Sequence, residues 1–465
     1  MPFGKKLTLD SFVIAIFLSA LDLGIVSPSL TMISADLGFP VRWVIWVIAL
    51  HLAVFVLALP LMEAWGARAG RRNWFAVSLV LFAAGSFAVG ASDNWWSLIG
   101  GRVIQALGAG GVVPLLSVEI RRLIYLRRRS WRLAVHLVLA GLLILVPFLS
   151  SSVAWHYSWR WLFWINLPAA AAVYLLSLRF TPDTGYRNPP FQTTGLFYFA
   201  VILLSAMIAV SQLDPHQGWA MLVDPGFLPF AVLAIGLVVP LLMVERQANR
   251  PFFQAGLLSD LRLIGLYAAV ALAGCTWVAV VLVPGWMAGV LDHPQGTGGA
   301  YLSIVAGAAW LTLPLARWIS SRWGYQGGLA LGFFSTAAAY FTLALADDPL
   351  TLTVVLAVLG SGLGFTLTAP VHELLFEVVP FRQLKNGLIA IAMFRAAGGA
   401  LGLVLIGLAF FEPVKTGWDA AGLPALWEQG FRMGMMTAAG VAVLGFVISL
   451  LLPLPEETGD NRRGE

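Results

Sequence analysis

The stretch WWSLIGGRVIQALGAGGVVPLL, residues 95–116, is an apolar run with a single charge, Arg102, set inside it. Trp95 and Trp96 are typical of a helix that enters a membrane interface, where indole rings gather. The run is long enough to cross a hydrocarbon layer of about 30 Å as a helix. An arginine near the middle of such a span costs about 2.5–3.5 kcal/mol, so Arg102 needs a partner.

The composition of the whole chain agrees with this reading. Its 465 residues are 59% hydrophobic and 11% charged, with a mean hydropathy of +0.85, whereas ordinary soluble domains are about 25% charged. A single soluble core stops growing at about 250–300 residues. We therefore expect an all-α membrane protein, and its single cysteine, Cys275, leaves no disulfide framework.

Apolar blocks of membrane-spanning length recur from end to end and predict fourteen helices. These are expected at about 11–35, 42–63, 73–92, 95–119, 132–153, 159–180, 192–213, 225–244, 262–290, 298–317, 326–346, 350–372, 385–411 and 431–453. An even number of spans puts both termini on one side of the membrane.

The positions of the basic residues predict the direction of the spans. With this segmentation, 22 of the 28 lysines and arginines lie on the side of the N-terminus, and basic residues concentrate in cytoplasmic loops. Both termini are therefore predicted to be cytoplasmic, in a multi-pass protein of the bacterial inner membrane. The run RRLIYLRRRSWR (121–132) fits an anchor on anionic inner-leaflet lipids or a partner-binding segment. The net charge of +5 is a topology signal, and we expect no nucleic-acid partner.

Several function classes are excluded by what the loops lack. No loop is long enough for a nucleotide-binding domain, and the sequence has neither a phosphate-binding loop nor a Cys/His cluster with metal-ligand spacing. We therefore expect no cofactor, no metal and no enzymatic activity. If the protein is a transporter, an ion gradient drives it, or the substrate crosses by facilitated diffusion.

Two charges are predicted to lie at similar membrane depth. Arg102 is about 10 Å from the outer side and Asp22 about 16 Å from the inner side at 1.5 Å per residue. If they face each other, directly or through Gln105, the two opposite charges compensate one another. Asp22 could then exchange protons, because burial raises the pKa of its carboxyl while a nearby guanidinium lowers it. The alternative is a static ion pair that holds two helices together.

Two further polar residues are predicted within spans. His51 lies about 12 Å deep and could join a proton path, or simply be hydrogen-bonded in the core. Arg395 lies about ten residues into its span, and both a structural and a substrate-binding role stay open. The glycines that follow it predict close helix packing: Gly398, Gly399 and Gly402. Trp277 and Trp310 could line a substrate cavity or pack against other helices.

Four stretches resemble one known family. They are LDLGIVSPSL (21–30), IGGRVIQALGAGG (99–111), SWRWLFWINLP (158–168), and the pair GSGLGFTLTAP (360–370) and RAAGGALG (395–402). Together they are similar to the major facilitator superfamily, in its fourteen-helix drug–proton antiporter branch, over nearly the whole chain.

The resemblance implies a fold and a function. The fold is two six-helix bundles, 1–182 and 251–465, joined by a two-helix insert at 183–250. The function is proton-coupled export of amphipathic compounds, in which Asp22 matches the branch's proton and substrate site. Arg102 and Gln105 match its fourth-helix motif.

Two motifs depart from the family pattern. The predicted gating loop MEAWGARAGRR (62–72) has Glu63 in place of the usual Gly and Ala67 in place of an Asp that helps hold the two halves together, while it keeps Arg68, Gly70, Arg71 and Arg72. The fifth-helix antiporter motif appears as VPFLSS (146–151). It keeps Pro147 and the small Ser150 and Ser151 but lacks the close-packing glycines, which counts against antiport.

The function predicted from these observations is export of hydrophobic or amphipathic small molecules by proton-coupled alternating access. The alternatives are a transporter of a lipid, siderophore or organic anion with weak or no proton coupling, and a non-pumping accessory or sensor protein. The expected partners are the small-molecule substrate, protons and membrane lipids. A periplasmic adaptor stays open, with FEPVKTGWDAAGLPALWEQG (411–430) as the only outer loop long enough to offer a surface.

Overall fold

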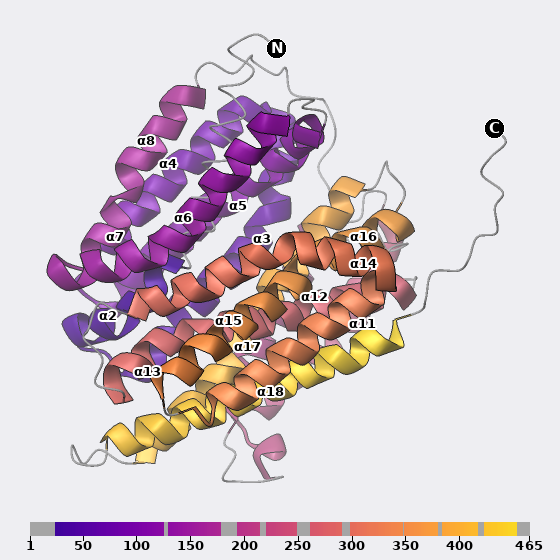
Figure 1. Ribbon diagram of the computed structural model, residues 1–465. Helices are drawn as coiled ribbons and strands as arrows, with labels where there is room; N and C mark the ends of the chain where they lie inside the picture. Colours follow the sequence, from indigo (N-terminus) through magenta and orange to yellow (C-terminus); the bar gives the residue numbers. More distant parts are fainter. Residues whose placement is uncertain are drawn as a thin grey trace, which may run out of the picture.

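The computed structural model is helical throughout the residues that it describes (Figure 1). These residues are 24–124, 129–177, 193–213, 220–248, 261–290, 298–346, 348–379, 384–416 and 423–452. Most of the first predicted span, including Asp22, lies outside them. The prediction of an all-helical fold is confirmed over the described part of the chain.

The helices follow the predicted spans in chain order. The first half contains η1 (Ser27–Ser29), α2 (Leu30–Leu37), η2 (Val41–Trp43), α3 (Val44–Ala69), α4 (Arg71–Gly90), α5 (Trp95–Ile124), α6 (Arg129–His156), α7 (Arg160–Trp164) and α8 (Asn166–Ser177). The predicted insert contains α9 (Thr193–Ser211), α10 (Leu228–Gly236) and α11 (Val238–Gln247). The second half contains α12 (Leu261–Ala279), η5 (Val280–Leu282), α13 (Val283–Val290), α14 (Gly298–Leu343), α15 (Pro349–Leu367), α16 (Ala369–Val378), α17 (Leu384–Thr416) and α18 (Leu423–Leu451).

Some predicted spans are divided and others are joined. The span predicted at 159–180 is divided into α7 and α8, whereas α14 joins two predicted spans across Gly324, whose φ of 70° is a left-handed conformation suited to glycine. The predicted outer loop at 411–430 is mostly helix, because α17 continues to Thr416 and α18 begins at Leu423. Over the described residues, nine helical stretches are long and apolar enough to cross a membrane. The count of fourteen spans stays a prediction.

Glycines allow the helices of the first half to approach closely. A Cβ at Gly108 would lie 2.3 Å from the Phe82 backbone nitrogen, and one at Gly85 would lie 2.2 Å from the Gln105 backbone nitrogen. Larger residues would push α4 and α5 apart at these crossings. The small residues therefore let two mostly apolar helices meet backbone to backbone.

The same device joins α12 and α17 in the second half. A Cβ at Gly398 would lie 2.0 Å from the Ala271 carbonyl oxygen, and one at Gly402 would lie 2.5 Å from the Cys275 Cα. The Cys275 thiol donates a hydrogen bond to the Gly398 carbonyl oxygen at 2.9 Å. The predicted close packing at these glycines is confirmed.

The largest contacts between the two halves of the chain are two helix crossings, and shorter contacts accompany them. α3 packs against α17, α6 packs against α14, and η1 lies against η5 and α13. The Ser27 hydroxyl donates to the Val281 carbonyl oxygen at 2.9 Å across this boundary. Figure 1 shows the two sets of helices converging at the ends that carry α2, α7 and α13. The charge distribution of the sequence predicts these ends to be the outer ones.

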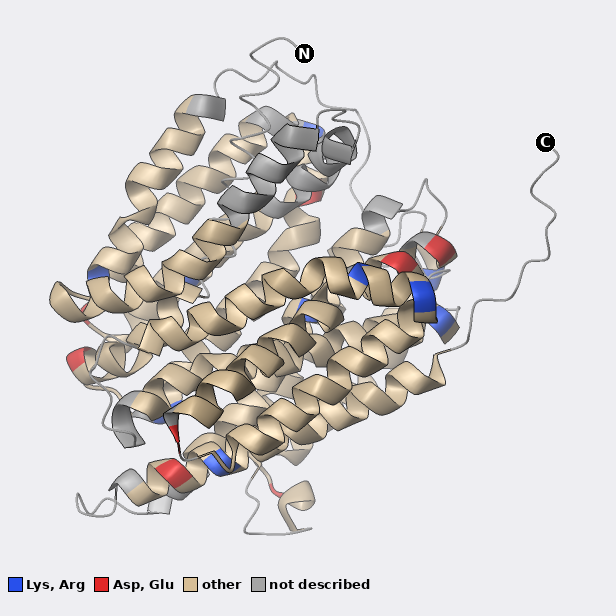
Figure 2. Cartoon of the chain, viewed as in Figure 1, with Lys and Arg blue, Asp and Glu red and all other residues tan. Residues whose placement is uncertain are grey.

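Charged side chains are sparse along the helices and gather at their ends. Figure 2 shows a broad band of uncharged residues through the middle of the described helices, with few basic positions inside it. This distribution is what a hydrocarbon layer requires, since an unpaired charge there is costly.

Candidate functional site

A cavity of about 280 Å³ lies where the two halves meet, and we call it the central cavity. Both halves contribute to its wall: η1 and α6 from the first, and α12, η5, α14 and α15 from the second. Its lining residues are Gly24, Ser27, Leu143, Pro147, Trp277, Val278, Val280, Val281, Leu302, Val305, Ala306, Ala309, Leu363 and Leu367.

The wall of the central cavity is apolar except at Ser27, whose hydroxyl is bonded to Val281. A ligand here would be held by burial of apolar surface, at about 25 cal/mol per Å². Trp277 is part of the wall, whereas Trp310 is not. Gly24 belongs to the same sequence motif as Asp22 and follows it by two positions, although Asp22 itself lies outside the described residues.

The Arg102 side chain is fully buried and hydrogen-bonded inside the first half. Its Nε donates to the Val47 carbonyl oxygen of α3 at 3.1 Å, and its Nη1 donates to the Gln105 Oε1 at 2.7 Å. The guanidinium also lies over the Phe163 ring, 5.8 Å from its centroid. Hydrogen bonds to a charged group are worth about 1.5–3 kcal/mol, so these contacts offset much of the cost of burial.

Gln105 extends these contacts to two more helices. Its Nε2 donates to the Ser86 hydroxyl of α4 at 2.9 Å, and the Asn166 amide of α8 lies 3.5 Å from the same hydroxyl. All of these side chains are buried. We call Arg102, Gln105, Ser86 and Asn166 the Arg102 network, which links α5, α4 and α8 and touches α3.

Sequence reasoning placed Arg102 with Gln105 but missed Ser86 and Asn166. Ser86 could have been found as a small polar residue inside an apolar span. Asn166 could have been found because it lies in the WINLP stretch that carries the family resemblance. Neither Arg102 nor Gln105 lines the central cavity in this conformation. Their roles in proton coupling therefore stay predictions.

His51 is buried on α3, one turn from Val47. Its neighbour Leu52 lies at the crossing of α3 with α17, where its Cδ1 is 3.3 Å from a Cβ built at Gly399. His51 therefore lies near the boundary between the halves but does not line the central cavity.

Arg395 caps a helix end beside the central cavity. Its Nη2 donates to the Leu367 carbonyl oxygen at 3.0 Å, where α15 ends and the backbone at Thr368 leaves the helical conformation. Leu367 is itself part of the cavity wall. The buried Arg395 Nε has no hydrogen-bond partner among the described residues. Arg395 thus makes a structural hydrogen bond and also lies where it could contact a substrate in the central cavity.

The predicted gating loop is a single-residue connection. α3 ends at Ala69, α4 begins at Arg71, and Gly70 between them has φ 89° and ψ 128°, which only glycine adopts readily. Glu63 is half-buried and Arg68 is exposed. The side chains of Arg71 and Arg72 lie outside the described residues.

The altered antiporter motif on α6 lies at a close helix crossing. A Cβ at Gly299 of α14 would lie 1.9 Å from the Pro147 carbonyl oxygen and 2.7 Å from the Ser151 Cβ. The Ser150 hydroxyl bonds back to the Pro147 carbonyl oxygen at 2.9 Å. At this crossing the glycine that permits the close approach is on α14, and the prediction that the missing glycines of α6 count against antiport stays a prediction.

A polar cluster ties three helices together at the predicted outer end. Asp36 lies in the last turn of α2. Its carboxylate accepts hydrogen bonds from the Trp159 indole at 3.0 Å and from the Arg160 guanidinium at 2.5 Å. Arg160 also donates to the Ser92 carbonyl oxygen at 3.1 Å. These two donors hold the pKa of the Asp36 carboxyl below its ordinary value. Sequence reasoning did not identify this cluster.

Solved structures share the fold of this chain. A bacterial homolog of the human lysosomal transporter Spinster, in an inward-facing and unoccupied conformation, matches with a TM-score of 0.66 at 12% identity over 97% of both chains. The human organic anion transporter MFSD10 matches with a TM-score of 0.57 at 14% identity, over 97% of this chain and all of that one.

Curated relatives cover most of the sequence at low identity. The multidrug transporter protein MdtP of Bacillus subtilis (strain 168) is 25% identical over 87% of this chain and 75% of its own. A probable triacylglyceride transporter of Mycobacterium leprae (strain TN) is 25% identical over 98% of this chain and 97% of its own. The family model of the Major Facilitator Superfamily matches residues 12–403. The chain is therefore a multi-pass membrane transporter that belongs to the Major Facilitator Superfamily.

Proposed function

We propose that this transporter exports hydrophobic or amphipathic small molecules across the bacterial inner membrane in exchange for protons, with both termini in the cytoplasm. The observation that carries the proposal is the apolar central cavity at the boundary of the two halves. One of its lining residues, Gly24, follows Asp22 by two positions in the sequence. A cavity of this lining favours ligands with a large apolar surface. The multidrug relative and the resemblance to the drug–proton branch support the same function.

The proposed cycle uses Asp22 as the proton carrier. Protonation from the outside releases the substrate, and discharge of the proton on the inside makes the carboxylate available again. Arg102 does not give up its proton under these conditions, so its part is to set the proton affinity of Asp22 from within the Arg102 network. Contacts such as Ser27 with Val281 would break when the outer ends separate.

The first test measures substrate-dependent transport in proteoliposomes with an imposed proton gradient. The panel contains lipophilic cations, organic anions and lysolipids. Ala306→Trp fills the central cavity, and Ala338→Trp, on the exposed face of the same helix, is its control. We expect Ala306→Trp to abolish transport of the substrate that the wild type moves, with little change for Ala338→Trp. Equal transport by both variants would contradict a substrate path through this cavity.

A second candidate function is transport of a lipid or an organic anion. Arg395 favours it, because its guanidinium adjoins the cavity wall and its Nε has no partner among the described residues. The triacylglyceride relatives also favour a lipid. In the same assay, Arg395→Gln should reduce transport of anionic compounds at least tenfold and leave cations unaffected. Arg432→Gln, at an exposed arginine on α18, is the matched control. Equal effects on anions and cations would remove this candidate.

A further inference from the structure

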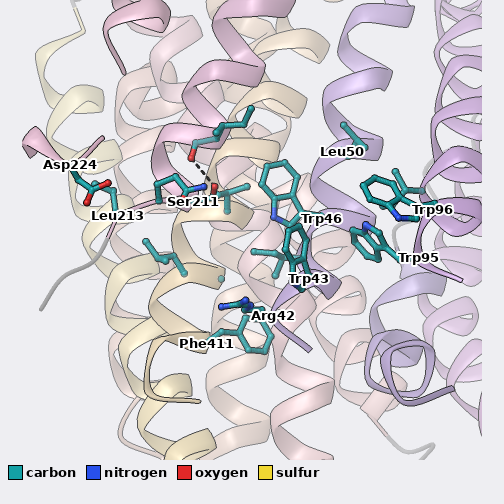
Figure 3. Close-up of a pocket in the computed structure, with 17 residues that line it drawn as sticks. Arg42, Trp43, Trp46, Leu50, Trp95, Trp96, Ser211, Leu213, Asp224 and Phe411 are labelled. Atoms are coloured by element: carbon teal, nitrogen blue, oxygen red, sulfur yellow. Dashed lines mark hydrogen bonds between the residues drawn. The ribbon is translucent and has the colours of Figure 1, made fainter. Parts of the chain in front are cut away.

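A second, larger cavity of about 690 Å³ opens at the predicted outer ends of four helices, and we call it the lateral cavity. Its volume is within the range of about 300–1,000 Å³ usual for small-molecule sites. Figure 3 shows its tryptophans gathered in one group, with Arg42 beside Phe411 below them. The residues that the argument uses are Arg42, Trp43, Trp46, Trp95, Trp96 and Ser211.

The lateral cavity is built from three parts of the chain. η2, α3 and α5 supply the tryptophans, α17 supplies apolar residues around Leu408, and α9 of the predicted insert supplies Ser211 at its end. α9 packs against both α3 and α17. The insert therefore completes this wall, which gives it a role that the central cavity does not require.

The lining changes in character along η2 and α3. Arg42 is exposed at the outer end, in η2. Trp43 and Trp46 follow, and Leu50 lies one turn beyond Trp46, about 6 Å along α3 at 1.5 Å per residue. Figure 3 shows this order, from Arg42 through the indoles to Leu50. A cation, an indole belt and an aliphatic wall in sequence match the head, interface and chain of a membrane lipid.

The charges of the cavity favour an anionic head. Arg42 makes no hydrogen bond or ion pair with the residues that the structure describes. Among the described lining residues Asp224 is the only carboxylate. It lies on the side opposite the tryptophans, and its Oδ1 already accepts the Gly226 backbone N–H at 2.6 Å. Arg42 is thus the charge placed to meet a ligand.

We propose that the lateral cavity binds a phospholipid with an anionic headgroup from the outer leaflet, with its phosphate on Arg42 and an acyl chain against the indoles and Leu50. This site is separate from the central cavity and does not depend on the transported substrate. Its assignment therefore stands or falls independently of the proposed function.

The head contact is tested by native mass spectrometry of the full-length protein in detergent. The protein is delipidated and titrated with phosphatidylglycerol, and in parallel with diacylglycerol of the same chains. One basic contact at a membrane surface corresponds to a preference of about fivefold for the anionic lipid. Arg42→Gln should erase that preference, and Arg432→Gln, at an arginine paired with Glu428 on α18, should retain it.

The chain contact is tested by filling the cavity. Ser211→Trp introduces an indole where the hydroxyl donates within its own helix, to the Ile208 carbonyl oxygen. It should weaken binding of both lipids at least tenfold, while Ser321→Trp, at an exposed serine with the same kind of bond, should not. Inorganic phosphate is added as a competitor, and displacement of the lipid by millimolar phosphate would reduce the site to an anion site.

The outcomes distinguish a specific lipid-binding site from a cavity that binds lipids without selectivity. Wild-type affinity and preference in both Arg42→Gln and Ser211→Trp would overturn the proposal. So would equal binding of the two lipids by the wild type. Each variant is first checked for a single size-exclusion peak, and because Arg42 is exposed, its variant keeps the test informative if Ser211→Trp does not fold.

Discussion

At the scale of single residues, the cost of burying Arg102 explains the side chains around it. The guanidinium is met by a backbone oxygen, an amide oxygen and an aromatic face, each from a different helix. Gln105 matters because its amide both accepts from Arg102 and donates to Ser86. Removing it leaves a buried donor and a buried hydroxyl to find other partners.

Gln105→Leu should therefore destabilise the protein by about 1.5–3 kcal/mol, the worth of a hydrogen bond to a charged group. Thermal unfolding in detergent measures the loss. Gln247→Leu, at an exposed position at the end of α11, should change the midpoint little. Equal midpoints for Gln105→Leu and the wild type would mean that the amide does not support the buried guanidinium.

The outer cluster at Asp36 predicts a pH dependence. Because Trp159 and Arg160 hold the Asp36 pKa below its ordinary value, this carboxylate contributes stability above pH 4 that is lost as the pH falls through its lowered pKa. Asp36→Asn should thus lower the unfolding midpoint at pH 7, and the difference should shrink toward pH 3. The effect should stay below about 1 kcal/mol, since the Asp36 side chain is 44% exposed. A difference that grows on acidification would contradict this assignment.

Sequence reasoning reached only part of the residue-scale picture. Arg102 and Gln105 are three positions apart on one helix, so their contact follows from helical periodicity. Ser86 and Asn166 lie 19 and 61 positions from Gln105, and only the packing of α4 and α8 brings them near. The pairing of Arg102 with Asp22 stays a prediction, because Asp22 lies outside the described residues.

At the scale of helices, glycines decide where backbones meet and where they turn. Gly70 connects α3 to α4 in a conformation with φ 89° that other residues rarely adopt. Gly70→Ala should cost about 1–3 kcal/mol of backbone strain. The midpoint of thermal unfolding measures this cost. Gly100→Ala is the control, because its added methyl group meets nothing within 4 Å. An unchanged midpoint for Gly70→Ala would show that the turn relaxes without strain.

The crossing of α6 and α14 predicts a conformational effect. Gly299→Ala places a methyl group against the Pro147 carbonyl oxygen, and overpacking of this kind costs about 1–3 kcal/mol. Because the two helices belong to different halves, the strain should be relieved by separation of the outer ends. Spin labels at positions 96 and 345, in a Cys275→Ser background, should report longer distances by electron resonance. Gly141→Ala on α6 is the control, and unchanged distances in Gly299→Ala would contradict the effect.

Helices were easier to predict than their interruptions. Each predicted span that the structure describes coincides with one helix or with consecutive helices, because runs of apolar residues require helical hydrogen bonding in lipid. The breaks at Ile165 and Thr368 and the joining of two spans across Gly324 depend on local backbone geometry. The close approach at Pro147 could not be foreseen from the α6 sequence, since the glycine that allows it, Gly299, is on another helix.

At the scale of the whole molecule, the ends of the two halves that are predicted to face outward are in contact, and the central cavity lies behind them. Ser27 with Val281 and Gly299 with Pro147 join the halves beside this cavity. The same residues would separate when the outer side opens, which is how an alternating-access transporter would release its substrate. The Arg102 network stays within one half, so it can keep its geometry while the halves move.

The measurement that tests the central claim most directly is proton flux in proteoliposomes, with the substrate that the wild type transports. Asp22→Asn is compared with the wild type, and Asp93→Asn, at an exposed carboxylate on the predicted outer side, is the control. The account predicts that substrate dissipates an imposed proton gradient with the wild type and Asp93→Asn but not with Asp22→Asn, although Asp22→Asn still folds. Proton-coupled transport by Asp22→Asn at the wild-type rate would contradict it.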